Sequence, residues 1–172
     1  MENCSVEATA AIRAATRWRR PEIIDVGERP AALWPWLVEE GSLTARLRAH
    51  CGDAFRVRVL ASGESELTAG EADWTGCPRA YVREVHLCCG ATPWVHARTI
   101  AVGAAAEARL RGLGESPLGD GAFEQPSTTR DSLEIARVAQ PGAEWTRRSV
   151  LHVDGEPLYI AESFLDGGTP WQ

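Results

Sequence analysis

Lysine is absent from the sequence, and all 18 of its basic residues are arginines. A lysine Schiff base is therefore impossible, which excludes pyridoxal-phosphate catalysis and lysine-dependent aldol chemistry. A Walker A loop is excluded as well, because it needs its lysine. The G-x-S-x-G and H-E-x-x-H motifs of common hydrolases are also missing. Arginine, by contrast, is abundant, and its planar guanidinium matches a carboxylate in two-point contact.

Long apolar runs are absent too. No stretch reaches the roughly 18 apolar residues that a membrane-spanning helix needs, so we expect no membrane partner. The first residues lack the apolar core of a secretory signal. The basic segment 13–20 is compatible with a transit peptide, but Glu2 and Glu7 argue against one. We therefore expect residues 1–25 to form a loosely ordered N-terminal arm and the protein to be cytoplasmic.

The cysteines lack the C-x-x-C spacing of common zinc and redox sites, and their number, 5, is odd. We expect free thiols in a reducing cytoplasm. Cys88 and Cys89 are neighbours, so on a strand their side chains point to opposite faces and cannot clamp one metal together. His86 and Cys88 would share a face, but no second ligand pair accompanies them, so we expect no metal site.

A strongly basic surface is missing as well, because the formal net charge is -6. This charge disfavours nucleic acid as a partner. It also means that an anionic ligand would have to be held by a few placed cations rather than by the overall field. With 172 residues and no internal repeat, we expect a single domain over residues 1–172.

Alternating polarity and turn residues predict a series of short elements. The expected helices are Pro30–Val38, Leu43–His50 with Ser42 as its N-cap, and Gly103–Leu113. The expected strands are Phe55–Ala61, Tyr81–Cys89, Trp94–Val102, Leu133–Val138, Arg148–Val153 and Leu158–Leu165. We expect a turn at Ser62-Gly63, a turn or cap at residues 127–131, and a type I′ hairpin turn at Asp154-Gly155. Local hairpins with interspersed helices predict an α+β fold with an antiparallel sheet.

Two charged residues break the alternation of these strands. Arg83 shares a strand face with Tyr81, Val85 and Leu87, and Glu162 shares one with Leu158, Ile160 and Phe164. A charge that faces a core is costly unless it is paired or hydrogen-bonded. One interpretation is a buried Arg83–Glu162 salt bridge or a sheet edge. The other is a pocket in which the arginine binds a ligand carboxylate and the glutamate a polar group.

Arg98 is a weaker case of the same kind. It shares a face with Trp94, His96 and Ile100. It is either a second cation near the pocket or an ordinary surface arginine.

The sequence resembles the chorismate pyruvate-lyase family of ubiquinone biosynthesis from about Trp36 to Leu165. The matching stretches are Trp36-Leu37 with Glu40-Gly41-Ser42-Leu43-Thr44, Arg83-Glu84 with Leu87-Cys88, Pro93-Trp94 with Arg98-Thr99, Leu113-Gly114 with Ser116-Pro117-Leu118-Gly119, Thr129-Arg130-Asp131 with Glu134-Ile135, Arg147-Arg148-Ser149, and Gly155, Pro157-Leu158, Glu162 and Phe164-Leu165. Each piece is modest, and their order and spacing together make the match specific.

The resemblance implies a six-stranded antiparallel sheet with helical flaps over an internal ligand pocket. It implies that Arg83 and the backbone N–H of Leu118 bind the ring carboxylate of the ligand and that Glu162 meets its ring hydroxyl. Leu43 matches a flap position next to the ligand, and Arg98 matches an arginine associated with ligand access or release. Arg83 and Glu162 are the expected catalytic residues.

The implied activity is a cofactor-independent carbon–oxygen lyase that converts chorismate to 4-hydroxybenzoate and pyruvate, the first committed step towards ubiquinone. The family also implies slow release of the aromatic product from a monomer. Two alternatives stay open at this point: a non-catalytic module of related fold that binds a small aromatic acid as an effector, and a lyase that prefers a neighbouring substrate such as isochorismate.

Overall fold

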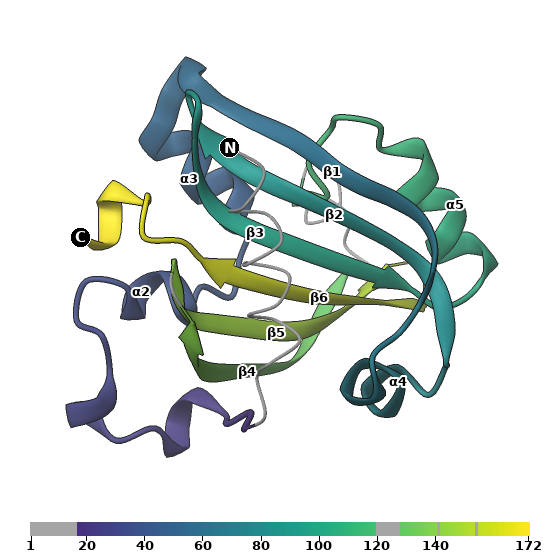
Figure 1. The fold of residues 1–172 in the computed structure, drawn as a ribbon, viewed down its shortest axis with the longest axis horizontal. Coiled ribbons are helices and arrows are strands. Elements are labelled where there is room, and N and C mark those ends of the chain that lie inside the picture. Colours follow the sequence, from purple (N-terminus) through teal and green to yellow (C-terminus); the bar gives the residue numbers. More distant parts are fainter. Residues whose placement is uncertain (1–16, 120–127, 141, 154) are drawn as a thin grey trace.

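Six antiparallel strands form one sheet in the order β1-β2-β3-β6-β5-β4 (Figure 1). The computed structural model describes residues 17–119, 128–140, 142–153 and 155–172. The strands are β1 (Phe55–Glu66), β2 (Arg79–Cys89), β3 (Thr92–Ala101), β4 (Thr129–Gln140), β5 (Ala143–Val153) and β6 (Glu156–Phe164). The expected α+β class and the six-stranded antiparallel sheet are confirmed.

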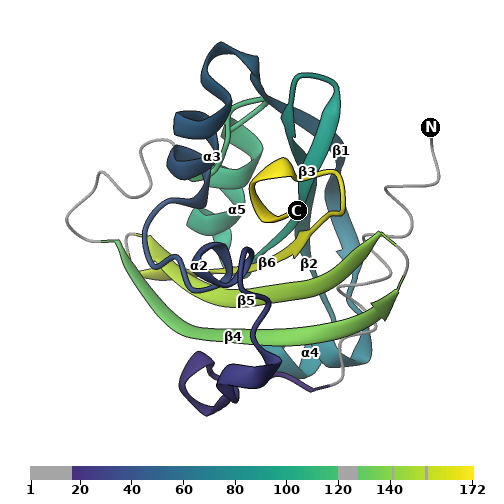
Figure 2. The same cartoon turned by 90° about the vertical axis from the view of Figure 1, so that its left-hand side faces the viewer.

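The helices are α2 (Trp34–Leu37), α3 (Leu43–Cys51), α4 (Ala69–Thr75) and α5 (Ala104–Gly112). Figure 2 shows the sheet curving around α3 and α5, which lie on its concave side. The predicted N-cap is confirmed, because the Ser42 hydroxyl accepts the Ala45 N–H at 3.1 Å. The start of α5 is held by the β5–β6 hairpin, where a Glu156 carboxylate oxygen accepts the Ala106 N–H at 2.6 Å.

The concave face carries two clusters of buried apolar side chains. One cluster joins α3 to the sheet and includes Leu43 and Leu47 on α3 and Leu87 on β2. The other joins α5 to the sheet and includes Leu110 on α5 and Leu158 on β6. The register of the sheet sets what lies between the clusters. Arg83 on β2 pairs with Thr99 on β3, and Glu162 on β6 pairs with Ala97 on β3 and Arg147 on β5. The two inward charges therefore lie at the boundary between two apolar regions.

The predicted turn at Ser62-Gly63 is wrong. β1 continues to Glu66 and stays paired with β2, with Ser62 opposite Arg83 and Gly63 opposite Val82. A register shift between Val59 and Ala61 disturbs the alternation at the point where the sequence suggests that the strand ends. Long-range pairing with β2 therefore prevails over the local turn propensity of Ser-Gly.

Two further elements differ from the prediction. β4 begins at Thr129, so residues 129–131 belong to a strand and not to a turn or cap. Its alternation is interrupted at Ser132, which has a φ of 55°. Helix α4 is absent from the predicted elements, although Thr68 and Glu71 form a capping box at its start.

Cys51 and Cys89 form a disulfide, with 5.6 Å between their Cα atoms. The expectation of free thiols is wrong for this pair. Cys51 ends α3, a short turn leads from it into β1, and Phe55 at the start of β1 pairs with Cys89. The end of the helix therefore meets the end of β2. Among the residues that the structure describes, Cys77 and Cys88 are free.

The segment that precedes α2 contacts the sheet. Arg19 exchanges backbone hydrogen bonds with Ile135 on β4, at 3.0 and 2.7 Å, and Ile24 is 1% exposed. Residues 17–25 of the expected loose arm are thus packed against the protein, and residues 1–16 lie outside the described residues. None of the described helices has the length and apolar character to cross a membrane.

We predict that reduction of the Cys51–Cys89 disulfide destabilises the protein. Opening a loop with a sequence separation of 38 residues lowers the free energy of unfolding by about 2–4 kcal/mol, because the denatured chain gains freedom. Urea denaturation with and without dithiothreitol measures this loss, and Cys51→Ser should abolish the effect of the reductant. Thiol titration of the denatured protein should count two more thiols after reduction than before. An unchanged count would contradict the disulfide.

Candidate functional site

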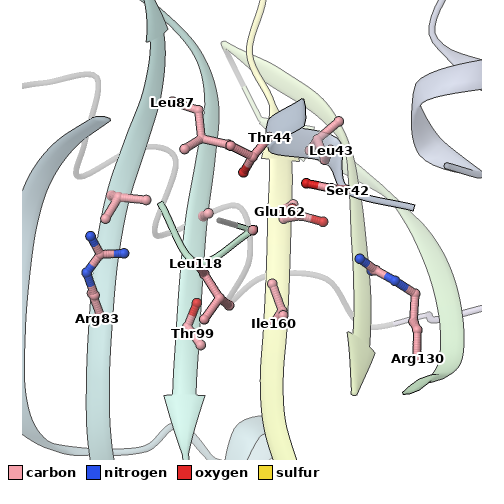
Figure 3. A pocket seen from close by; sticks show the side chains of 13 residues that line it. Ser42, Leu43, Thr44, Arg83, Leu87, Thr99, Leu118, Arg130, Ile160 and Glu162 are labelled. Carbon is pink, nitrogen blue, oxygen red and sulfur yellow. The ribbon is translucent and has the colours of Figure 1, made fainter. Parts of the chain in front are cut away.

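A pocket lies between the concave face of the sheet and the segments that cover it (Figure 3). Its lining side chains are Ser42, Leu43 and Thr44 at the start of α3, Arg83, Val85 and Leu87 on β2, Ala97 and Thr99 on β3, Leu118 and Gly119 after α5, Arg130 on β4, and Ile160 and Glu162 on β6. Four of the five predicted site residues line this pocket: Arg83, Glu162, Leu118 and Leu43. The wall is largely apolar, with charges at a few positions, as is usual for small-molecule sites.

The pocket is narrow in this conformation. Its volume is about 40 Å³, whereas a cavity of roughly 150 Å³ accommodates a benzene ring. The two covering segments meet at Gly119, where a Cβ atom would lie 2.7 Å from the Ser42 hydroxyl and 2.9 Å from Thr44. Only glycine allows so close an approach without displacing a neighbour. An aromatic ligand can therefore enter only when these segments move apart.

Arg83 is buried on the pocket wall, with 3% of its surface exposed. Its Nη2 donates to the carbonyl oxygens of Gly114 and Ser116, both at 2.9 Å. No carboxylate of a described residue forms an ion pair with it, so the buried Arg83–Glu162 salt bridge is not present. Burial lowers the pKa of Arg83, which reflects the cost of holding a desolvated charge. An anionic ligand would offset that cost.

Glu162 is held by a second arginine, which the sequence analysis does not single out. Arg147 is fully buried, and its Nε donates to Glu162 Oε2 at 2.6 Å. Its Nη1 donates to the carbonyl oxygens of Trp36, Leu37 and Glu39, at 3.0, 3.3 and 2.9 Å. The other carboxylate oxygen, Oε1, accepts no hydrogen bond within the described part of the chain. Glu162 thus offers one oxygen to a ligand while its charge stays compensated.

Arg147 and Arg130 are the two site residues that the sequence analysis misses. In β5, Trp145, Arg147, Ser149 and Leu151 all occupy buried alternate positions. This pattern is a readable signal, but the predicted strand begins at Arg148 and so omits Arg147. Arg130 is missed because the sequence places it in a turn or cap, whereas it is the second residue of β4.

Arg98 does not line the pocket with Arg83. It lies on the opposite face of the sheet, because its neighbours Ala97 and Thr99 are the ones that face the pocket. It is not a surface arginine either, since it is 2% exposed. Its Nε donates to Glu71 at 2.6 Å, and its Nη1 donates to Glu84 on β2. The expectation of a second cation near the pocket is therefore wrong for Arg98.

Buried histidines extend this polar group on the opposite face. His86 and His96 are both 0% exposed, and their rings lie edge to face. His86 Nδ1 accepts a hydrogen bond from Arg58 at 2.8 Å. Burial, followed by the charges of His96 and Arg58, lowers the pKa of His86 to about 4. No group of three potential metal ligands occurs among the residues with described positions.

The fold and the site define a small α+β protein with a pocket between one antiparallel sheet and the segments that cover it. A family model described as chorismate lyase matches residues 12–171. The chain belongs to the chorismate lyase family.

Curated relatives agree with the family model. The chain is 37% identical to the chorismate pyruvate-lyase of Sodalis glossinidius, over 92% of this chain and 90% of that protein. It is 36% identical to the probable chorismate pyruvate-lyase of Photobacterium profundum, over 87% and 85% of the two chains. It is also 38% identical to the chorismate pyruvate-lyase of Erwinia tasmaniensis, over 78% and 79%.

We predict that Arg147→Met lowers the free energy of unfolding by about 3–5 kcal/mol, because it leaves the Glu162 carboxylate buried without its partner. Urea denaturation measures this loss. Arg137→Met is the control. Arg137 lies on the neighbouring strand β4, its side chain is 68% exposed, and it pairs with Glu144, so its removal should lower stability by no more than about 1 kcal/mol. The double variant Arg147→Met/Glu162→Met should recover part of the loss. Equal losses in the two single variants would contradict the role of Arg147.

We predict that His86 makes the protein less stable below pH 6.5. Its folded pKa of about 4 lies below the unfolded value of 6.5, so between these values the unfolded state binds the extra proton. Stability is complete above pH 6.5 and falls as the pH approaches 4, by roughly 2 kcal/mol at pH 5. Urea denaturation at pH 7 and pH 5 should show a smaller difference for His86→Gln than for the wild type. A difference as large in His86→Gln as in the wild type would contradict this prediction.

Proposed function

We propose that this chain is a chorismate pyruvate-lyase that converts chorismate to 4-hydroxybenzoate and pyruvate. The observation that carries the proposal is that two buried side chains of opposite charge line one narrow pocket without pairing with each other. Arg83 has hydrogen bonds to carbonyl oxygens alone among the described residues, and Glu162 turns one carboxylate oxygen towards the same space. A ligand with a carboxylate at one end and a hydroxyl at the other satisfies both groups.

The reaction needs little chemistry from the protein. Chorismate loses the bond between the ring and the enolpyruvyl ether oxygen, together with the hydrogen on the ring carbon that bears the hydroxyl. The methylene carbon of the departing enolpyruvyl group gains a proton, which yields pyruvate, and the ring becomes aromatic. Aromatisation drives the reaction. The tasks that remain for the protein are to position the substrate and to manage one proton.

Each pocket residue then has a role. Arg83 binds the ring carboxylate by charge-assisted hydrogen bonds, and the backbone N–H of Leu118 supports it from the same loop that holds the Arg83 guanidinium. Glu162 accepts the hydrogen bond of the ring hydroxyl and assists the proton transfer. Leu43 at the start of α3 covers the ring. Arg98, on the other face of the sheet, has no assigned contact with the substrate.

The segments that cover the pocket determine how fast the product leaves. The aromatic product would lie under the start of α3 and the loop at Gly119, which touch each other. Product release therefore requires the same opening as substrate entry, and we expect release to limit turnover.

We propose a monomer as the active unit. We place the enzyme in the cytoplasm, at the entrance to ubiquinone biosynthesis. A disulfide is unusual in a reducing compartment, so we expect Cys51 and Cys89 to be largely reduced in the cell.

We predict that the purified protein forms 4-hydroxybenzoate from chorismate without added metal, measured by chromatography of the product. Arg83→Gln should lower kcat/KM roughly 10- to 100-fold or more and should weaken 4-hydroxybenzoate binding by a similar factor in calorimetry, because substrate and product both carry the ring carboxylate. Glu162→Gln should also lower kcat/KM.

Arg79→Gln is the control for these variants. Arg79 lies on the same strand as Arg83, and its side chain is 62% exposed, so this variant should behave as the wild type. Tight binding of 4-hydroxybenzoate without turnover would instead indicate an effector-binding module. Wild-type activity in Arg83→Gln and Glu162→Gln would contradict the proposed site.

A further inference from the structure

The pocket contains a second guanidinium, that of Arg130, which has no role in the reaction proposed so far. Arg130 comes from β4, at the edge of the sheet opposite to β1, and it lines the same space as Arg83 and Glu162. Figure 3 shows Arg83 and Arg130 on opposite sides of the pocket, with Glu162 between them. β6 lies two strands from β2 and two strands from β4. Through the paired registers, Arg83 is level with Ile160 and Arg130 is level with Leu158. With about 4.8 Å between strands and about 3.4 Å of rise per residue, their backbones are roughly 12 and 16 Å from that of Glu162.

Arg130 is anchored on both sides of the pocket. Its Nη1 donates to the Ser149 hydroxyl on β5 at 2.7 Å, and its Nη2 donates to the Gly41 carbonyl at 3.3 Å. Gly41 directly precedes the N-cap of α3, so the guanidinium bridges the sheet and a covering segment. Such anchoring fixes the direction of a long side chain before a ligand arrives.

The Arg130 side chain is partly buried. Burial is the largest influence on its pKa and lowers it, because the guanidinium is withdrawn from water. Glu162, Glu39 and Glu40 act in the opposite direction, and Arg147 acts with burial. A ligand carboxylate in the pocket would stabilise this desolvated cation as well as Arg83.

The order of the three groups matches the order of polar groups on the proposed substrate. Chorismate has a carboxylate on one ring carbon, a hydroxyl on the carbon opposite and the enolpyruvyl ether on the carbon next to the hydroxyl. When the ring carboxylate lies at Arg83 and the hydroxyl at Glu162, one of the two ring orientations turns the enolpyruvyl group towards β4 and Arg130. Of the two carboxylates of chorismate, the product 4-hydroxybenzoate retains only the one on the ring.

We propose that Arg130 binds the enolpyruvyl carboxylate of the substrate, an inference that rests on the proposed function. Arg130 is then a substrate-binding residue that holds the leaving group and has no contact with the aromatic product. The two arginines divide the dianion between them. Arg83 recognises what the substrate and the product share, and Arg130 recognises what the reaction removes.

The experiment compares substrate and product in the same variants. Arg130→Gln should lower kcat/KM for chorismate roughly 10- to 100-fold, the loss expected for a hydrogen bond between charged groups. The Kd for 4-hydroxybenzoate, measured by calorimetry, should stay within about 2-fold of the wild-type value. Arg83→Gln should lose affinity for both molecules. Arg130→Lys keeps the charge without the planar group, so it should lose less kcat/KM than Arg130→Gln.

Arg137→Gln is the matched control, because Arg137 lies on the same strand and its exposed side chain pairs with Glu144 outside the pocket. It should leave both measurements unchanged. Wild-type kcat/KM in Arg130→Gln would overturn the proposal. An equal loss of chorismate turnover and 4-hydroxybenzoate binding would also overturn it, because Arg130 would then only maintain the shape of the pocket.

Failure of the proposed function gives a different result. In that case the wild type produces no 4-hydroxybenzoate from chorismate, and the two ligands are compared by binding alone. Selective loss of chorismate affinity in Arg130→Gln would still support the second carboxylate site. Unchanged chorismate affinity would overturn it. Should Arg130→Gln fail to fold, the same comparison in Arg130→Lys decides, since a selective loss for chorismate supports the proposal and no loss overturns it.

Discussion

The buried pair of Arg147 and Glu162 is the interaction on which the architecture of the pocket depends. Arg147 neutralises the glutamate and satisfies three backbone carbonyl oxygens in the segment 36–39, just before the covering helix α3. The glutamate is therefore paired inside an apolar wall, and the polypeptide that leads to α3 is fixed to the sheet at the same point. The pair thus links the sheet at Glu162 to the segment that leads into α3.

The two faces of the sheet handle buried charge in different ways. On the face away from the pocket, Arg98 is matched by Glu71 and Glu84, so its charge is compensated within the protein. On the pocket face, Arg83 is bonded to neutral carbonyl oxygens. The Arg147–Glu162 pair on the pocket face is likewise balanced inside the fold, so under the proposed function Arg83 is the charge that a bound carboxylate would balance.

The sequence supports prediction of the sheet, the N-cap of α3, and the inward positions of Arg83 and Glu162, because these follow from alternation and local capping. Alternation shows which residues share a face of a strand but not which face lies under the covering helices, and the prediction for Arg98 fails for that reason. Arg130 and Arg147 are missed because the predicted strands begin after them. The Cys51–Cys89 disulfide joins a helix end to a strand end, a contact that only the assembled register creates.

Arg83 contacts both the covering loop and the space in which a ligand would bind. One nitrogen of its guanidinium holds the loop at Gly114 and Ser116, and that loop continues to Leu118 and Gly119. The remaining donors, Nε and Nη1, point to no described acceptor. A carboxylate that binds them is therefore connected through one rigid, planar group to the segment that covers it. Binding of a carboxylate at Arg83 and closure of the loop at Leu118 and Gly119 are therefore coupled, so each increases the probability of the other.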